Sequence, residues 1–527
     1  MAATPSVVSS GPVVIAAHSE DVRNHSAPAV HTLQSQEKEK DAEKEDGALQ
    51  QGTDEPPYSV WSRWEKIALV LFGSAASTLS TMSGQIYFPV IQTIADAFHV
   101  SIQAINLTVT SYLILQGLSP MIFGPIADAK GRRLALIICL TILTGSCIGM
   151  AVMPEDAYWL LVLLRAVQST GSASTISIGY GLITDIATPS ERGMLIGLAG
   201  IAPMLGPSLG PIVAGVLADK FGWRGIFWFL AALSAAVDVA IILFMPETLR
   251  AIVGDGSIRP PWYLRPVLPA MTKYNRWSTE VGDAENIVVA RGSTKYQWPT
   301  FLKEPDVVAA LTSTAIIFAL FQAVSASLSP MLLDAYPYLN QSTIGLCFLP
   351  VGVAGIIGAV VQGKVIDSEF RRAGGTKGGV LPPEFPIEYT RLRLVPIYLT
   401  GAVCTAIIFG WTTGHTSLAA PLAFLFFYGW STIAFMNVYQ TLILDLLPGQ
   451  GASVTAASNL FRCLLGAGVV AGVDALRRRL GSGWTFVLLG GLTVVLVLPI
   501  LAFSRMCGPR FREKRRLRKE RLAARQL

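Results

Sequence analysis

Three charged residues lie inside long apolar stretches of this sequence, and chemistry is expected there first. Arg165, Asp238 and Arg462 are each flanked by aliphatic and small residues. A charge in such surroundings is costly to desolvate, so each one is a hypothesis for a functional site. Arginine is suited to bidentate binding of carboxylates. We therefore expect proton coupling or substrate binding at these positions, with Gln168 and Asn459 of the same segments included.

The sequence leaves several partners open for the two arginines. Asp238, a backbone carbonyl or the substrate could each offset the buried charge. A structural pair, or a side chain that reaches the membrane interface, is the alternative to a functional Arg165. If an arginine faces a cavity, the cargo should be anionic or a neutral hydrogen-bond acceptor.

Other chemistry is missing from the sequence. No Gly-x-x-x-x-Gly-Lys-Ser/Thr loop is present, which excludes a nucleotide-driven pump of that type. The five histidines and six cysteines have no metal-ligand or disulfide spacing. An enzyme would need a cluster of titratable groups, and the apolar stretches offer almost none. We expect no catalytic residues, no metal and no cofactor.

The elements that hold the three charged residues are membrane spans. Only 14% of the 527 residues are charged and the mean hydropathy is +0.50, whereas soluble domains carry about 25% charged residues. A span needs roughly 20 apolar residues. We predict twelve spans, at 66–90, 104–124, 133–152, 157–183, 193–218, 225–245, 306–334, 342–366, 391–411, 418–444, 451–475 and 482–504.

The spans divide the chain into two halves of six, which predicts an all-α membrane protein of two pseudo-repeats. The polar and charged stretches set the remaining boundaries. We expect a disordered tail at 1–62, six-span halves at 63–248 and 305–504, a linker at 249–304, a loop at 367–393 within the second half, and a basic tail at 505–527.

The distribution of basic residues predicts the orientation. With both termini in the cytosol, 34 of the 41 Lys and Arg residues lie on the cytosolic side and five on the other. The triplet Arg477 to Arg479 is the one discordant cluster. We interpret the basic tail at 505–527 as facing anionic lipid rather than nucleic acid.

A charged loop recurs in the two halves and supports an internal repeat. The pattern Gly-x-x-x-Asp-x-x-x-Arg-Arg occurs after the second and eighth spans, 239 residues apart. We expect it to stabilise one orientation of the two halves. Its predicted residues are Gly124, Asp128, Gly131, Arg132 and Arg133 in the first half, and Gly363, Asp367 and Arg371 in the second.

The fifth span is rich in glycine and carries Gly206, Pro207 and Gly210. Small residues let helices approach closely, and proline can kink a helix. We expect this span to pack against a neighbour in the other half and to close the cavity on one side.

Several segments together resemble one known family. The loop at 124–133 resembles the signature loop of the major facilitator superfamily, and the segment around Arg165 resembles the motif whose arginine is implicated in proton coupling. The segment 206–211 resembles the motif of antiporters. Ile86-Tyr-Phe-Pro89, Pro246-Glu-Thr-Leu249 and Ser458-Asn-Leu-Phe-Arg-Cys463 narrow the resemblance to the fungal twelve-span drug:proton antiporter family, in the branch with quinidine-resistance transporters and mould citrate exporters.

The resemblance covers residues 60–510 and implies a proton-coupled exporter of a small organic molecule such as a secondary metabolite, toxin or drug. A dedicated organic-acid exporter is the alternative, followed by a transporter-like sensor without flux. The expected partners are the lipid bilayer, a small substrate and protons, without nucleic acid. We expect a monomer in the plasma membrane.

Overall fold

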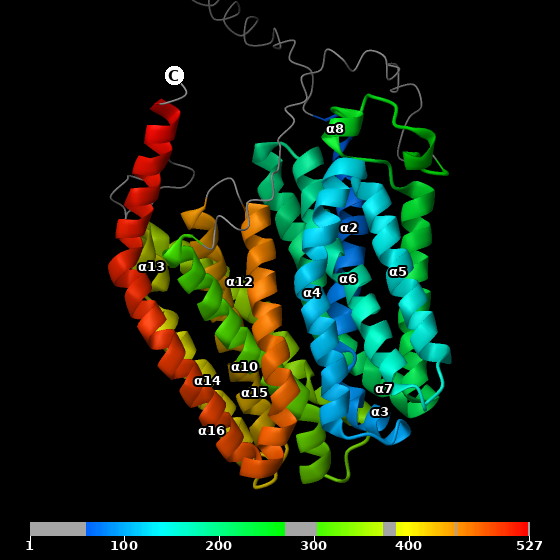
Figure 1. Cartoon of the computed structure of the whole chain (residues 1–527), viewed down its shortest axis with the longest axis vertical. Coiled ribbons are helices and arrows are strands. Elements are labelled where there is room, and N and C mark those ends of the chain that lie inside the picture. The colour runs from blue at the N-terminus through cyan, green and yellow to red at the C-terminus, as the bar shows by residue number, and fades with distance from the viewer. Residues whose placement is uncertain (1–58, 269–302, 373–385, 448–450, 525–527) are drawn as a thin grey trace, which may run out of the picture. The chain divides into compact units, whose positions relative to one another are not determined.

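The computed structural model describes residues 59–268, 303–372, 386–447 and 451–524, and these are mainly helical (Figure 1). The chain divides into two units, Met1–Pro57 and Tyr58–Leu527. All described residues belong to the second unit, so most of the predicted tail at 1–62 lies outside them. The described part begins just before helix α2, which starts at Arg63. Ser62 caps this helix, because it accepts a hydrogen bond from the Glu65 N–H while the Glu65 carboxylate accepts one from the Ser62 N–H at 2.7 Å.

Long helices occupy the predicted span positions. In the first half the elements are α2 (Arg63–Gln85), η1 (Phe88–Val90), α3 (Ile91–Ala97), α4 (Ile102–Lys130), α5 (Arg132–Val152), α6 (Tyr158–Ile186), α7 (Pro189–Phe244), α8 (Arg250–Val253) and η2 (Trp262–Leu264). In the second they are α10 (Pro305–Ala335), α11 (Gln341–Cys347), α12 (Leu349–Arg372), α13 (Ile387–Leu392), α14 (Val395–Thr412), α15 (Ala419–Leu446) and α16 (Gly451–Ala524).

Two of these helices each contain two passes. α7 and α16 turn at Gly222 and Gly481, whose φ angles of 68° and 78° interrupt the helical backbone. Glycine adopts this left-handed conformation without the steric penalty of a side chain. Within the described residues, nine helical stretches are long and apolar enough to cross a membrane. With the two double passes and the more polar α6, the described chain has the twelve passes that the sequence predicts.

The halves pack internally and against each other along particular helices. In the first half α2 packs on α7, and α6 packs on α4 and α5; in the second, α10 packs on α16 and α15 packs on α12 and α14. The main contacts between halves join α4 to α16 and α7 to α11 and α12. These interfaces position the charged residues described next.

Candidate functional site

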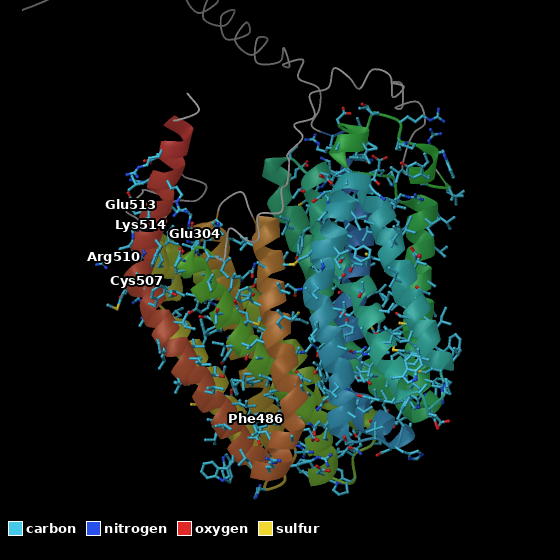
Figure 2. The ribbon with its side chains drawn as sticks, in the orientation of Figure 1. Glu304, Phe486, Cys507, Arg510, Glu513 and Lys514 are labelled. Carbon is cyan, nitrogen blue, oxygen red and sulfur yellow. The ribbon has the colours of Figure 1, made fainter. Side chains whose placement is uncertain are left out.

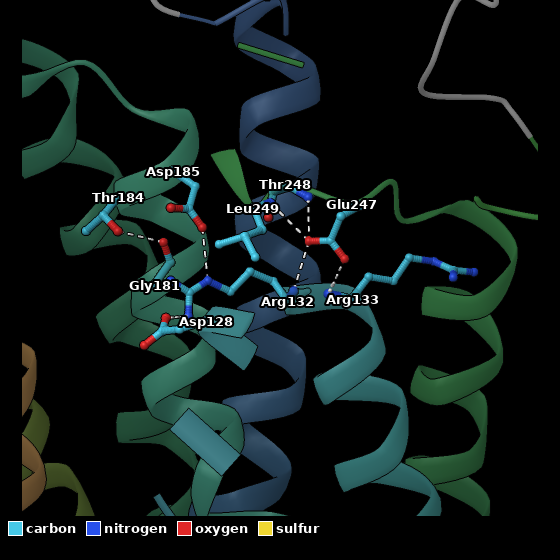
Figure 3. A network of polar contacts seen from close by, with 9 residues as sticks. All are labelled: Asp128, Arg132, Arg133, Gly181, Thr184, Asp185, Glu247, Thr248 and Leu249. Carbon is cyan, nitrogen blue, oxygen red and sulfur yellow. Dashed lines mark hydrogen bonds and ion pairs between the residues drawn. The ribbon is translucent and has the colours of Figure 1, made fainter. Parts of the chain in front are cut away.

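The charged loop of the first half joins three helices at one end of the bundle, which we call the Arg132 end (Figure 3). Arg132 lies at the start of α5 and pairs with Asp128 in α4, with Nη1 2.5 Å from Oδ1. Its Nε also contacts Oδ2 of Asp185, at the end of α6, at 3.0 Å. The pairing with Asp128 follows the predicted pattern, whereas the Asp185 contact depends on how α6 packs.

A carboxylate that the sequence analysis missed completes this cluster. Glu247 follows α7, and its Oε1 accepts hydrogen bonds from the backbone N–H groups of Arg132, Thr248 and Leu249 at 2.9 to 3.0 Å. Its Oε2 accepts one from the Arg133 N–H at 3.2 Å. Burial raises the pKa of the Glu247 carboxyl, and the four N–H groups act in the opposite direction. Glu247 thus caps a helix from another part of the chain.

Gly131 makes this capping possible. It precedes α5 with φ 117°, and as the N-cap residue it has no side chain to satisfy the first N–H groups of the helix. A Cβ at this position would collide with the Glu247 carboxylate. Asp128 therefore does not cap α5 and serves only as an ion-pair partner of Arg132.

Arg133 holds the other side of the loop. Its Nη2 donates to the carbonyl of Ile242 at 2.8 Å, near the end of α7, and its Nη1 donates to the carbonyl of Tyr263 at 3.3 Å. The residues that contact Asp128, Arg132 and Arg133 in the described part of the chain all belong to the first half. The cluster therefore fixes α4, α5, α6 and α7 to one another at the Arg132 end.

The predicted loop residues of the second half lie only partly within the described side chains, and their role stays a prediction. Gly363 and Arg371 are exposed near the end of α12, and the side chain of Asp367 lies outside the described residues. The ion pair in the corresponding place joins Arg391 in α13 to Asp445 in α15, with Nε 2.9 Å from Oδ2.

The distances along the sequence show how the Arg391–Asp445 pair relates to the repeated loop pattern. Asp128 and Asp367 are 239 residues apart, but Arg132 and Arg391 are 259 apart, as are Gly222 and Gly481. The second half therefore has about 20 more residues between Asp367 and Arg391 than the first half has between Asp128 and Arg132. The arginine that corresponds to Arg132 by its place in the fold is therefore Arg391, whereas the local pattern at 363–372 ends in Arg371 and Arg372.

Arg165 is enclosed within the first half. Its side chain is fully buried in α6 between the rings of Tyr87 and Tyr112, with Cζ 4.2 and 4.3 Å from the ring centroids. Nη1 donates to Oε1 of Gln168 at 2.5 Å and to the carbonyl of Ser83 at 3.4 Å. Nε and Nη2 have no hydrogen-bond partner. Among the described residues no carboxylate is within ion-pair distance, so rings, an amide and a backbone carbonyl surround the charge.

Asp238 lies elsewhere. It is buried in the second pass of α7 and accepts a hydrogen bond from the Thr141 hydroxyl of α5 to Oδ2, at 2.9 Å. Its Oδ1 is buried and has no partner. Of the three partners considered for Arg165, the structure shows the backbone carbonyl and excludes a pair with Asp238 in this conformation.

Arg462 differs from Arg165 because it is only partly buried. It lies in the first pass of α16, with Cζ 5.5 Å from the Phe318 ring of α10. Its Nη2 is 3.4 Å from Oδ1 of Asn459, and its Nε has no hydrogen-bond partner. Asn459 also donates to the carbonyl of Gln116 in α4 at 2.9 Å, which joins the two halves beside the arginine.

The glycine-rich part of α7 contacts both halves. A Cβ on Gly206 would collide with Thr81 of α2, and one on Gly210 would lie 3.3 Å from backbone atoms of α2, so these two glycines face their own half. Pro207 lies beside Gly206 and is partly buried. The adjacent face meets the other half, because a Cβ on Gly352 of α12 would collide with Ser208 of α7 and Gly215 of α7 meets the carbonyl of Gln341 at the start of α11.

The halves are also joined at the end opposite Arg132. Both carboxylate oxygens of Asp219, in α7, accept hydrogen bonds from the first N–H groups of α11, those of Gln341 at 3.1 Å and Ser342 at 2.8 Å. The Ser329 hydroxyl of α10 donates to the Pro89 carbonyl at 2.8 Å. These inter-half hydrogen bonds lie at the end of the bundle away from Arg132.

Two of the three discordant arginines of the predicted outer surface form ion pairs at this same end. Arg477 contacts Asp334 of α10 at 2.8 Å, and Arg478 contacts the buried Asp474 at 2.8 Å. Arg479 is exposed. Because the orientation rule counts Lys and Arg residues rather than net charge, the triplet remains the one discordant cluster.

The basic C-terminal segment continues α16 beyond the last span (Figure 2). Arg515 is buried there and donates from Nη2 to Asp306 at the start of α10, at 2.6 Å to Oδ1, and from Nη1 to the Leu446 carbonyl at 2.8 Å. Arg510 and Lys514 are exposed on the same segment. The segment is thus partly bound to the second half, and its role toward lipid stays a prediction for the exposed residues.

Two six-helix halves that pack on each other through α4 and α16 and through α7, α11 and α12, and that carry buried charges within their spans, define a polytopic membrane protein of the kind that works by alternating access. Comparison with known proteins identifies the family. Residues 73–471 match the model described as Major Facilitator Superfamily. The chain belongs to this superfamily, and it is a membrane transporter rather than an enzyme.

Relatives and solved structures agree with this assignment. The chain is 36% identical to "MFS-type transporter phiD" of a fungal species, over 89% of this chain and 73% of that protein. It is 33% identical to "Citrate exporter 1" of Aspergillus niger, over 89% and 91%, and 31% identical to "Multidrug transporter QDR2" of Candida glabrata, over 84% and 81%. An inward-facing bacterial homologue of the lysosomal transporter Spinster shares the fold, with a TM-score of 0.60, 15% identity, and 86% of this chain and 98% of that chain covered.

Proposed function

We propose that this transporter exports a small organic molecule across the plasma membrane in exchange for protons, with both termini in the cytosol. The observation that carries the proposal is the pair of interior arginines in a bundle whose halves, among the described residues, are hydrogen-bonded to each other beside Arg462 and at the end opposite Arg132 but not at the Arg132 end. A solute can then enter from the Arg132 end, which the excess of basic residues places in the cytosol.

Proton coupling needs a group that changes its protonation between the two states. Asp238 is the candidate, because its Oδ1 is buried without a partner and a bound proton would remove the cost of that charge. Arg165 and Gln168 contribute a fixed positive charge enclosed by rings. The relative named as a multidrug transporter supports export of foreign compounds, and the one named as a citrate exporter supports export of an organic acid. The transporter acts as a monomer.

A flux measurement tests the proposal. The full-length protein in sealed vesicles, oriented by a protease-sensitive tag, should move citrate or a lipophilic cation against its gradient only when a pH gradient is imposed. Asp238→Asn should abolish the dependence on pH while leaving downhill exchange. Uptake that ignores the pH gradient would reject proton coupling, and binding without flux would favour the sensor.

A dedicated organic-acid exporter is the second candidate, and one observation favours it. In the described spans, Arg165 and Arg462 have no carboxylate within ion-pair distance, so the interior presents positive charge to a solute. An inside-negative potential also favours export of an anion, by about 2.3 kcal/mol per charge at 100 mV.

A further inference from the structure

We propose that Arg462 binds a carboxylate group of the transported molecule, in a site formed with Asn459, Gln116 and Gln322 between the two halves. This inference rests on the proposed transport function and specifies its substrate class as organic acids. Three features support it: the side of the helix on which the Arg462 guanidinium lies, its N–H groups that have no hydrogen-bond acceptor among the described residues, and the neutral polar groups around it.

The exposure of Arg462 is directed into the bundle. On α16, Asn459 and Cys463 contact Gln116 of α4, and a Cβ on Gly466 would lie 3.3 to 3.4 Å from Phe318 and Gln322 of α10. Arg462 lies on this same face, since residues three and four apart on a helix are neighbours.

The opposite face of the helix belongs to the surface of the bundle. Leu464 is 47% exposed there, which suits contact with lipid. The Arg462 guanidinium lies on the inner side, because its Cζ is 5.5 Å from the Phe318 ring of α10 and its Nη2 is 3.4 Å from Asn459, which donates to the Gln116 carbonyl of α4. A solute that enters between the halves would reach this space between α4 and α10.

Arg462 also has unused hydrogen-bonding capacity. Its Nε is buried without a partner and its Nη2 has only the 3.4 Å contact with Asn459. A guanidinium binds a carboxylate through two parallel N–H groups, and leaving such donors unpaired in an apolar setting is costly. A carboxylate of the substrate would accept hydrogen bonds from these N–H groups and would also neutralise the charge.

The residues around Arg462 are amides rather than acids. Gln116, Asn459 and Gln322 supply neutral polar groups, and Oε1 of Gln322 is buried without a partner. In the described part of the chain no acidic side chain is within ion-pair distance of Arg462, so the positive charge is not cancelled. A lipophilic cation would be repelled here, whereas an organic acid would be attracted.

Arg165 does not offer the same opportunity. Its side chain has no exposed surface and is held between two tyrosine rings. A solute cannot reach it without a rearrangement of α4 and α6. Of the two interior arginines, only Arg462 is accessible for substrate binding in this conformation.

Binding is tested on the full-length protein in detergent, with acetate, succinate and citrate as probes and triethyl citrate as the uncharged control. We expect at least one of the acids, but not the ester, to raise the melting temperature. Arg462→Gln should weaken that binding by about 10- to 100-fold, with Arg462→Lys in between. Arg224→Gln, which removes an arginine exposed at the opposite end, should bind as wild type.

Asn459→Asp provides a second variant in case Arg462→Gln folds poorly. The new carboxylate would lie beside Nη2 and compete with the ligand, so we expect a comparable loss of binding. No stabilisation by any of the three acids, or unchanged affinity in both Arg462→Gln and Asn459→Asp, would overturn the proposal.

Flux in vesicles separates this inference from the proposed function. If wild type moves a lipophilic cation with the pH gradient but binds no acid, the carboxylate site is refuted and the transport function stands. If an acid binds through Arg462 but is not moved by any gradient, the site stands and the transport function fails.

Discussion

Asp219 is expected to control how often the halves separate at the end opposite Arg132. Its carboxylate, in the first half, caps the first two N–H groups of α11 in the second half at 3.1 and 2.8 Å. A helix cap contributes about 1 kcal/mol, and a negative charge at a helix N-terminus adds up to about 1 kcal/mol. Asp219→Ala should therefore remove about 1–2 kcal/mol from the state in which these ends touch. That change shifts the ratio of the two states by about 5- to 30-fold.

Cysteine accessibility measures this shift. Ser329 is fully buried at the same inter-half contact, so Ser329→Cys reports separation when a membrane-impermeant maleimide is added on that side. Labelling should be about 5- to 30-fold faster with Asp219→Ala, and less accelerated with Asp219→Asn, whose amide oxygen can still accept one bond. Asp156→Ala, at an exposed acid of the same end, is the matched control. Equal labelling rates in Asp219→Ala and the parent, at equal amounts of folded protein, would refute the reasoning.

Three further predictions concern other contacts. Asp128→Asn should lower transport by up to about 5-fold, the effect of losing a partly exposed ion pair worth up to about 1 kcal/mol that joins α4 to α5. Membrane levels should stay normal, because Arg132 keeps Asp185; unchanged export would remove Asp128 from the mechanism. Gly206→Leu should abolish coupled export, because the new side chain would collide with α2. Gly468→Leu should be tolerated, since a Cβ at Gly468 meets no atom within 4 Å. Normal export by Gly206→Leu would contradict this prediction. Arg515→Met should lower the free energy of unfolding by about 3–5 kcal/mol, and with it the melting temperature, because Asp306 is left buried and unpaired. Adding Asp306→Leu should restore most of this stability. A double variant that is no more stable than Arg515→Met would argue against the pair.

The span positions could be predicted because the membrane imposes them. A run of about 20 apolar residues is both the requirement for crossing a bilayer and a pattern visible in the sequence. The helices that carry Arg165, Asp238 and Arg462 therefore appear where expected. The pairing of Asp128 with Arg132 was also within reach, since both residues belong to one short loop.

The contacts between distant segments could not be predicted in the same way. Glu247 caps α5 although more than 100 residues separate it from Arg132, and no local pattern marks a cap supplied by another helix. The face that Gly206 presents depends on the rotation of α7 about its axis, which composition does not reveal. Arg371 repeats the motif of Arg132, but only the fold shows that Arg391 pairs with Asp445.

The additional residues in the second half also provide a position at which other sequences can be inserted. Arg391 keeps its contact with Asp445 whatever the length of chain before it, because α13 is held from the other side: Arg512 pairs with Glu388 at 3.4 Å, and Arg505 donates to the Leu392 carbonyl at 2.6 Å. Doubling the length of the chain that connects two fixed points costs only about 0.6 kcal/mol. An epitope or a recognition sequence for a modifying enzyme, placed between Arg372 and Pro386, should therefore give access to one half of the transporter while the other half keeps its short, fixed loop at Gly131.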